Sequence, residues 1–137
     1  MKSYDSETCG QYVVKALFNA RKYAYICSPY IDEKYANAIL DLAERKVFVK
    51  VISSSSEMFY FFRDHGSKTL RYNITHDNSP IVHTKMYIAD DCFGAEGSAN
   101  LTYNGMWQQM NSLSYCERRD EVESLKKRFE KLWETVA

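Results

Sequence analysis

Two pairs of polar residues have types and spacings that suit a reaction site. His83 and Lys85 lie two residues apart in IVHTKMYIAD, as do Ser98 and Asn100 in EGSAN. Two adjacent strands could present all four side chains on one face of a sheet. Histidine can act as a nucleophile or proton donor near neutral pH, while lysine and asparagine can bind an oxyanion. The pattern indicates chemistry on a negatively charged group such as a phosphodiester.

These residues belong to a longer pattern with fixed spacing. It reads His-x-Lys, four residues, Asp, six residues, Gly-Ser-x-Asn, and comprises His83, Lys85, Asp90, Gly97, Ser98 and Asn100. This pattern resembles the HKD signature of the phospholipase D superfamily. The stretches ICSPYID and GSANLTYNG are also similar to that family, and the resemblance covers nearly the whole chain. It implies a phospholipase D-like fold and a metal-independent phosphodiesterase that needs no cofactor.

The resemblance also implies a reaction that uses two histidines. One forms a phosphohistidine intermediate, while the other protonates the leaving oxygen and then activates water. Because this sequence has one motif, we expect an active homodimer in which two copies of His83 face each other, as in small single-motif members. The predicted catalytic residues are His83, Lys85, Ser98 and Asn100, with Asp90, Gly97 and Asn111 in supporting roles.

Two of the supporting residues differ from the others in what they are expected to do. Asp90 lies seven positions after His83, so on an unbroken strand it would face the opposite side and cap the hairpin turn or support a neighbouring element. At position 111 the family commonly has a glutamate that holds the catalytic histidine, whereas this sequence has Asn111. An amide does not stabilise the imidazolium by charge, so we expect a lower pKa for His83 and a slower reaction.

The motif predicts the class of reaction and leaves the substrate open. Small single-motif members resemble endonucleases, so we expect cleavage of DNA or RNA, with Tyr103 and Trp107 available for stacking if exposed and Tyr87 in the core. Arg118 and Arg119 would add local positive charge. One alternative is a phospholipase D or phosphatidyltransferase that acts on phospholipid headgroups. Another is a catalytically weak nucleic-acid-binding module.

The composition is typical of one soluble domain spanning residues 1–137, with 45% hydrophobic residues. Eighteen basic residues balance 18 acidic ones, so a polyanion would have to bind a local patch. No apolar run approaches the roughly 20 residues of a membrane helix, and we expect no stable membrane association. Scattered cysteines and the absence of an apolar leader predict a cytoplasmic protein. His65, His76 and Cys92 lack the spacing of metal ligands.

Helical and strand patterns alternate along the chain. Helices are expected at 6–22, from a cap at Asp32 to about 43, and at 57–66, 101–109 and 120–136. Strands are expected at 23–30, 47–53 and 69–76, from Pro80 to a turn at 89–91, and at 92–98 and 111–118. This order predicts a layered α-β-α architecture of the α/β class with a mixed, mainly parallel β-sheet.

Overall fold

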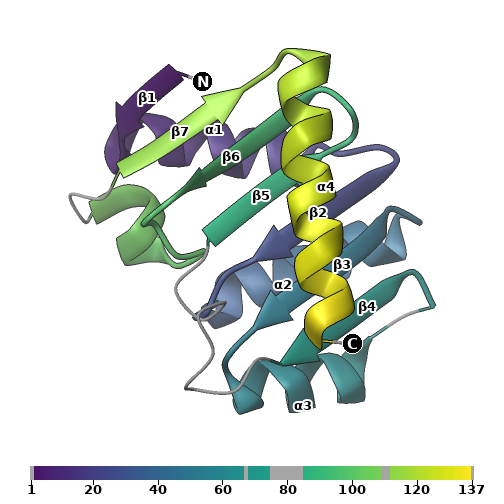
Figure 1. The fold of residues 1–137 in the computed structure, drawn as a ribbon. Helices are drawn as coiled ribbons and strands as arrows, with labels where there is room; N and C mark the ends of the chain where they lie inside the picture. Colours follow the sequence, from purple (N-terminus) through teal and green to yellow (C-terminus); the bar gives the residue numbers. More distant parts are fainter. Residues whose placement is uncertain (1, 67, 75–84, 109–111, 137) are drawn as a thin grey trace.

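The computed structural model describes residues 2–66, 68–74, 85–108 and 112–136. Within these ranges, seven strands form one sheet in the order β1-β7-β6-β5-β2-β3-β4 (Figure 1). The strands are β1 (Lys2–Asp5), β2 (Tyr23–Cys27), β3 (Phe48–Ser53), β4 (Leu70–Ile74), β5 (Lys85–Ala89), β6 (Phe93–Gly97) and β7 (Ser112–Cys116). The helices are α1 (Ser6–Phe18), α2 (Glu33–Glu44), α3 (Ser56–His65), the π-helical turn η2 (Asn104–Gln108) and α4 (Arg119–Val136).

The sheet separates two hydrophobic layers, because successive side chains of a strand point to opposite faces. In β2, Ala24 and Ile26 belong to the core cluster that α1, α2 and α3 cover, whereas Tyr25 and Cys27 belong to the cluster beneath α4. Figure 1 shows α4 running across one face of the sheet, with the other three α-helices behind it. The layered α/β architecture is therefore confirmed.

The sheet is mixed, as expected, but the prediction that it is mainly parallel was wrong. Among the described strands, β2, β3 and β4 pair in parallel. The other four pairings, β1 with β7, β7 with β6, β6 with β5 and β5 with β2, are antiparallel. Helices α2 and α3 supply the long crossovers that parallel neighbours need, whereas a short turn is enough to join β5 to β6.

Local capping signals explain where two of the helices begin. Asp32 accepts a hydrogen bond from the N–H of Tyr35 at 3.2 Å and caps α2, as the sequence predicted. A run of four serines at 53–56 supplies the cap of α3, since Ser55 Oγ accepts from the N–H of Met58 at 3.4 Å. The short strand β1 was not predicted; it exists through its pairing with β7.

Candidate active site

Lys85 lies at the edge of the sheet where β2 and β6 end. It is the first residue of β5 and pairs with Gly97, the last residue of β6. β5 also runs antiparallel to β2, where Met86 pairs with Cys27, the last residue of that strand. Burial raises the pKa of the Cys27 thiol to about 12, and the charge of Lys85 acts in the opposite direction. Lys85 therefore places a half-buried cation within electrostatic reach of the end of β2.

Tyr87 connects the strand that carries Lys85 to the segment that carries Ser98 and Asn100. Its side chain is fully buried, which confirms the expectation that it belongs to the core. Its hydroxyl donates a hydrogen bond to the carbonyl oxygen of Ala99 at 2.7 Å. Because Ala99 lies between Ser98 and Asn100, this buried bond holds the whole segment beside β5.

The loop that follows β2 is joined to the end of the same segment. Ser28 is fully buried, and its Oγ accepts a hydrogen bond from the N–H of Leu101 at 2.9 Å. Leu101 also forms a parallel bridge with Ile31, and its carbonyl accepts from the N–H of Asp32 at 3.3 Å. The second carboxylate oxygen of Asp32 accepts from the N–H of Tyr103 at 2.7 Å. Sequence reasoning assigned Asp32 to a helix cap and missed this second contact, as it missed Ser28.

Asn100 has an unusual environment within this segment. Its Oδ1 is buried and has no hydrogen-bond partner among the described residues. Leaving a buried acceptor unpaired costs about 1–3 kcal/mol, so this oxygen is a place for a hydrogen-bond donor such as a water, a side chain or a ligand. The backbone around it is tightly packed, because a Cβ added to Gly105 would lie 2.2 Å from the carbonyl oxygen of Asn100. Gly105 therefore allows η2 to approach and support Asn100.

Ser98 and Asn100 do not lie on a strand, contrary to expectation. β6 ends at Gly97, and the two residues follow it in an irregular segment. Ser98 is exposed and Asn100 is half-buried. The tertiary hydrogen bonds of Ala99 and Leu101, instead of a strand pleat, bring this segment to the edge that carries Lys85.

His83 and Asn111 lie outside the described residues. Their predicted roles, as nucleophile and as histidine partner, therefore stay predictions. The described part of the signature is Lys85, Asp90, Gly97, Ser98 and Asn100, of which all but Asp90 lie at one edge of the sheet.

Asp90 lies at the opposite end of β5 and adopts a left-handed backbone conformation, with φ of 53°, in the turn before β6. Its carboxylate accepts hydrogen bonds from the backbone N–H groups of Arg21 (3.1 Å), Lys22 (2.8 Å) and Tyr23 (3.1 Å). Aspartate tolerates the left-handed region better than most residues, and a carboxylate suits a cluster of backbone donors. Asp90 thus ties the β5–β6 turn to the loop that enters β2.

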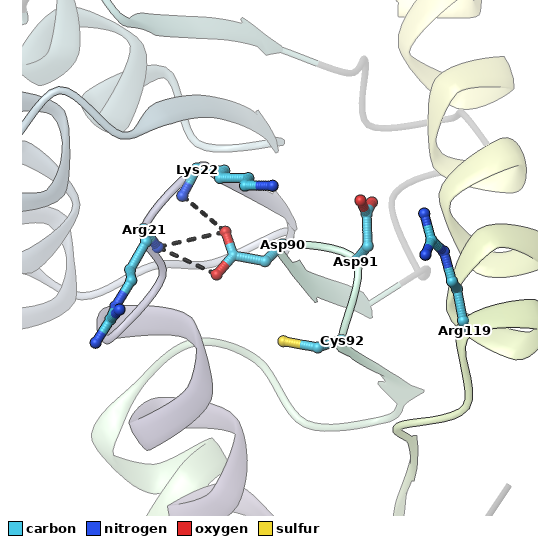
Figure 2. Close-up of a pocket in the computed structure, with 6 residues that line it drawn as sticks. All are labelled: Arg21, Lys22, Asp90, Asp91, Cys92 and Arg119. Carbon is cyan, nitrogen blue, oxygen red and sulfur yellow. Dashed lines mark hydrogen bonds between the residues drawn. The ribbon is translucent and has the colours of Figure 1, made fainter.

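An open pocket of about 420 Å³ is lined in part by this turn (Figure 2). Its lining residues are Arg21, Lys22, Asp90, Asp91, Cys92 and Arg119. The pocket contains none of the other signature residues, and it lies beyond the end of β5 that is far from Lys85. We therefore assign Asp90 no place at the edge that carries Lys85.

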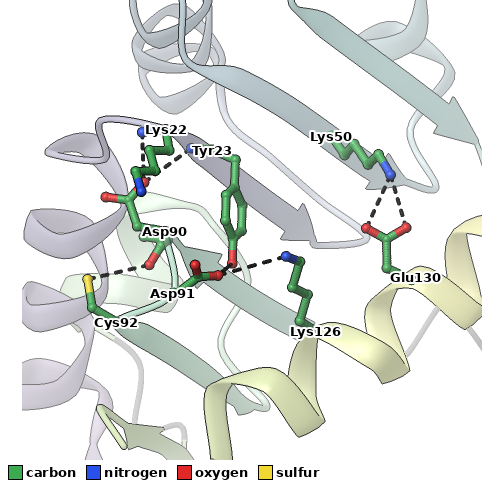
Figure 3. A network of polar contacts seen from close by, with 9 residues as sticks. Lys22, Tyr23, Lys50, Asp90, Asp91, Cys92, Lys126 and Glu130 are labelled. Atoms are coloured by element: carbon green, nitrogen blue, oxygen red, sulfur yellow. Dashed lines mark hydrogen bonds and ion pairs between the residues drawn. The ribbon is translucent and has the colours of Figure 1, made fainter. Parts of the chain in front are cut away.

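Two charged contacts hold α4 against its face of the sheet (Figure 3). Lys126 of α4 pairs with Asp91 at 3.8 Å, and its ammonium lies 4.5 Å from the centre of the Tyr23 ring, whose hydroxyl donates to Asp91 at 2.7 Å. Farther along the helix, Lys50 pairs with Glu130 at 3.0 Å. Both contacts lie on the face covered by α4, and they serve packing.

Within the described ranges, no group of three or more His, Cys, Asp and Glu side chains is placed to hold a metal ion. None of the helices described has both the length and the apolar character needed to cross a bilayer.

A mixed sheet between two helical layers, with a lysine and an asparagine of a spaced signature at one edge, defines an α/β protein whose signature residues gather at that edge. A family model described as "Cardiolipin synthase, PLD-like domain" matches residues 13–133, and the chain belongs to this phospholipase D-like family.

Two solved structures share the fold. NucT from Helicobacter pylori aligns over 99% of this chain and 96% of its own, with a TM-score of 0.77 and 17% identity. Nuc, a phospholipase D family member from Salmonella typhimurium, aligns over 99% of this chain and 93% of its own, with a TM-score of 0.74 and 16% identity. An uncharacterized protein from Streptococcus mutans is 29% identical over 139 residues, which cover 91% of this chain. The match spans 29% of that protein's length.

Proposed function

We propose that the protein is a metal-independent phosphodiesterase that cleaves DNA or RNA as an endonuclease, with His83 as the nucleophile. The observation that carries this proposal is that the Tyr87 hydroxyl holds the segment of Asn100 beside the strand of Lys85. A phosphodiester is negatively charged, so a cation and the N–H groups of a positioned amide would stabilise charge on its oxygens during displacement. Family membership supports this class of reaction.

The proposed reaction has two displacements. An imidazole nitrogen of His83 attacks phosphorus, and the bond to the leaving oxygen breaks as that oxygen takes a proton from a second histidine. The second histidine then removes a proton from water, which attacks the phosphohistidine and releases a phosphomonoester and free His83. Lys85 binds the phosphoryl oxygens in both steps.

The second histidine is proposed to be the partner's His83 in a homodimer. A mixing experiment tests this proposal, because a shared site fails when either histidine is lost. After subunit exchange with excess His83→Asn protein, wild-type activity should fall well below the value expected from simple dilution. Activity that tracks the amount of wild-type chain alone would contradict a shared site.

The substrate class is tested with fluorescent single-stranded and double-stranded DNA, RNA and a phosphatidylcholine reporter, all in EDTA. We expect nucleic acid to be cleaved by wild type and not by His83→Asn. The variant should keep the thermal unfolding curve and sedimentation of wild type, which separates lost chemistry from lost folding. Cleavage that occurs without EDTA and is abolished when EDTA is added would contradict a metal-independent reaction.

A second candidate function is phosphatidyl transfer or phospholipid hydrolysis, because the matching family model is described as a cardiolipin synthase domain. This candidate predicts release of a headgroup from vesicles that depends on His83, with the oligonucleotides left intact. A third outcome, salt-sensitive binding of oligonucleotides without cleavage at any protein excess, would identify a binding module.

A further inference from the structure

Large exposed hydrophobic side chains are scattered over the described surface, and two of them flank the candidate active site. Tyr30 is 63% exposed and Tyr103 is 48% exposed. The other three of this kind lie on α1, α3 and β3 and are Tyr12, Tyr60 and Phe48. A single exposed aromatic residue is ordinary, and it is their position that distinguishes these two.

Tyr30 and Asn100 are neighbours across the bridge between Ile31 and Leu101. The bridge is parallel, and each of the two residues immediately precedes one bridge partner. Ile31 is 6% exposed and Leu101 is fully buried, so the bridge pair faces inward. The residues before the two bridge partners are therefore neighbours along the two chains, with Tyr30 exposed and Asn100 half-buried. An exposed aromatic residue thus lies beside the residue that has the orphaned oxygen.

Tyr103 is linked by hydrogen bonds to the same Ile31–Leu101 bridge, through Asp32. Its N–H donates to Asp32 at 2.7 Å, and the N–H of Asp32 donates to the carbonyl of Leu101. The carbonyl of Tyr30 is likewise held, since it accepts from Ser28 Oγ at 2.7 Å. A tertiary hydrogen bond therefore fixes the backbone of Tyr103. A local hydrogen bond fixes the backbone of Tyr30, through a serine that also accepts from the N–H of Leu101.

The rings themselves have no stacking partner within the described part of the chain. No ring–ring or cation–ring contact involves Tyr30 or Tyr103 there, whereas the rings of Tyr23 and Tyr25 are each covered by a lysine. Backbones that are fixed and ring faces that are open are what a flat ligand requires. An unpaired nucleobase has such a face, whereas the bases of a duplex are already stacked on one another.

We propose that Tyr30 and Tyr103 form a base-stacking platform that makes the protein select single-stranded nucleic acid. The platform binds bases next to the phosphate at Lys85 and Asn100. This inference rests on the proposed nuclease function and adds the residues that select single-stranded over double-stranded nucleic acid. Stacking on aromatic side chains tolerates different sequences, so selection for strandedness comes without strong sequence preference.

The test compares the affinities of a short fluorescent oligothymidine and an abasic chain of equal length, both measured in the His83→Asn background. The abasic chain carries the phosphates without the bases. Tyr30→Ala and Tyr103→Ala should each weaken oligothymidine binding about tenfold or more, and leave binding of the abasic chain unchanged. Tyr30→Phe and Tyr103→Phe keep the rings and should bind as the parent does. Tyr60→Ala, which removes an exposed tyrosine from α3, is the matched control.

Three results would overturn the platform while leaving the nuclease function intact. They are unchanged oligothymidine affinity in both alanine variants, equal losses for both oligonucleotides, and a loss of the dimer in sedimentation that explains the weaker binding. If the parent instead binds neither oligonucleotide and wild type cleaves the phospholipid reporter in vesicles, the platform and the nuclease function both fail. Cleavage of DNA by wild type with unaltered binding in the variants separates the two failures.

Discussion

Lys85 and Asp90 stand at opposite ends of β5, so two residues of one signature serve different parts of the molecule. Lys85 lies where β2 and β6 end. Asp90 instead accepts three backbone N–H groups from the loop before β2. The acid of the signature therefore holds the fold together, and the lysine is the residue that we propose to act on a substrate.

Asp90→Asn should lower stability without removing activity from the folded protein. The amide has one acceptor oxygen and no charge, so the bonds to the three N–H groups weaken, and the free energy of unfolding should fall by about 1–3 kcal/mol. Urea unfolding measures the loss. Asp64→Asn is the control, because Asp64 is exposed and its ion pair is with the adjacent Arg63. Full stability combined with lost cleavage would instead place Asp90 in the chemistry.

Gly105→Ala should damage the candidate active site more than the fold. The new Cβ would lie 2.2 Å from the carbonyl oxygen of Asn100 and 2.9 Å from its nitrogen, so backbone must move. A displacement of about 1 Å can cost on the order of a hundredfold in rate, and we expect kcat to fall by about that factor.

The matched variant is Gly94→Ala. Its Cβ would meet the Leu125 side chain at 2.9 Å and the Cys116 sulfur at 3.3 Å, on the face covered by α4. This overpacking should cost about 1–3 kcal/mol of stability and leave kcat unchanged in the folded fraction. Equal effects of both glycine variants on kcat would mean that Asn100 needs no support from Gly105.

Tyr25 makes stability depend on alkaline pH. Burial and the adjacent Glu130 raise the pKa of Tyr25 from 10.0 to about 12. Because the pKa is raised in the folded protein, protonated Tyr25 contributes to the free energy of unfolding in full below pH 10. The contribution is lost as pH rises toward 12, because the unfolded chain releases its proton first. The loss should be about 1.4 kcal/mol per pH unit within that window.

Tyr25→Phe removes this ionisation, so its urea midpoint should fall less between pH 10 and 12 than that of wild type. The variant should also lose about 1 kcal/mol at neutral pH with the hydrogen bond to Glu130. Tyr60→Phe removes a hydroxyl from an exposed tyrosine and serves as the control. Parallel curves for Tyr25→Phe and wild type above pH 10 would contradict the assignment.

Local signals were enough to predict much of the fold. The cap Asp32 and the apolar stripe behind it predicted α2, and the serine run at 53–56 predicted the start of α3, because capping and periodicity act within a few residues. Strand direction in the second half was not predictable in this way. β5 joins β2 on the side away from β3, and β1 exists through pairing with β7, a partner more than a hundred residues away. Tertiary packing determines which strands pair and in which direction.

The candidate site likewise has residues that the sequence predicts and contacts that it does not. Fixed spacing identified Lys85 and Asn100, since a signature is a property of the sequence itself. The contacts that bring them to one edge, from Ser28 to Leu101 and from Asp32 to Tyr103, join positions about seventy residues apart and have no local signal. Tyr30 was missed for that reason, because its position beside Asn100 depends on the Ile31–Leu101 bridge.

Asn111→Glu should restore the charge that the family pattern places near the catalytic histidine. A carboxylate favours the imidazolium and raises the pKa of both copies of His83 in the proposed homodimer, so the protonated copy that releases the leaving oxygen would persist to higher pH. We expect a faster reaction and an alkaline limb of the pH–rate profile displaced upward by about one unit. Asn111→Gln keeps a neutral amide and should leave the limb in place. If the glutamate and glutamine variants gave the same profile, position 111 would not be the partner of His83, and the slower chemistry expected of this sequence would need another cause.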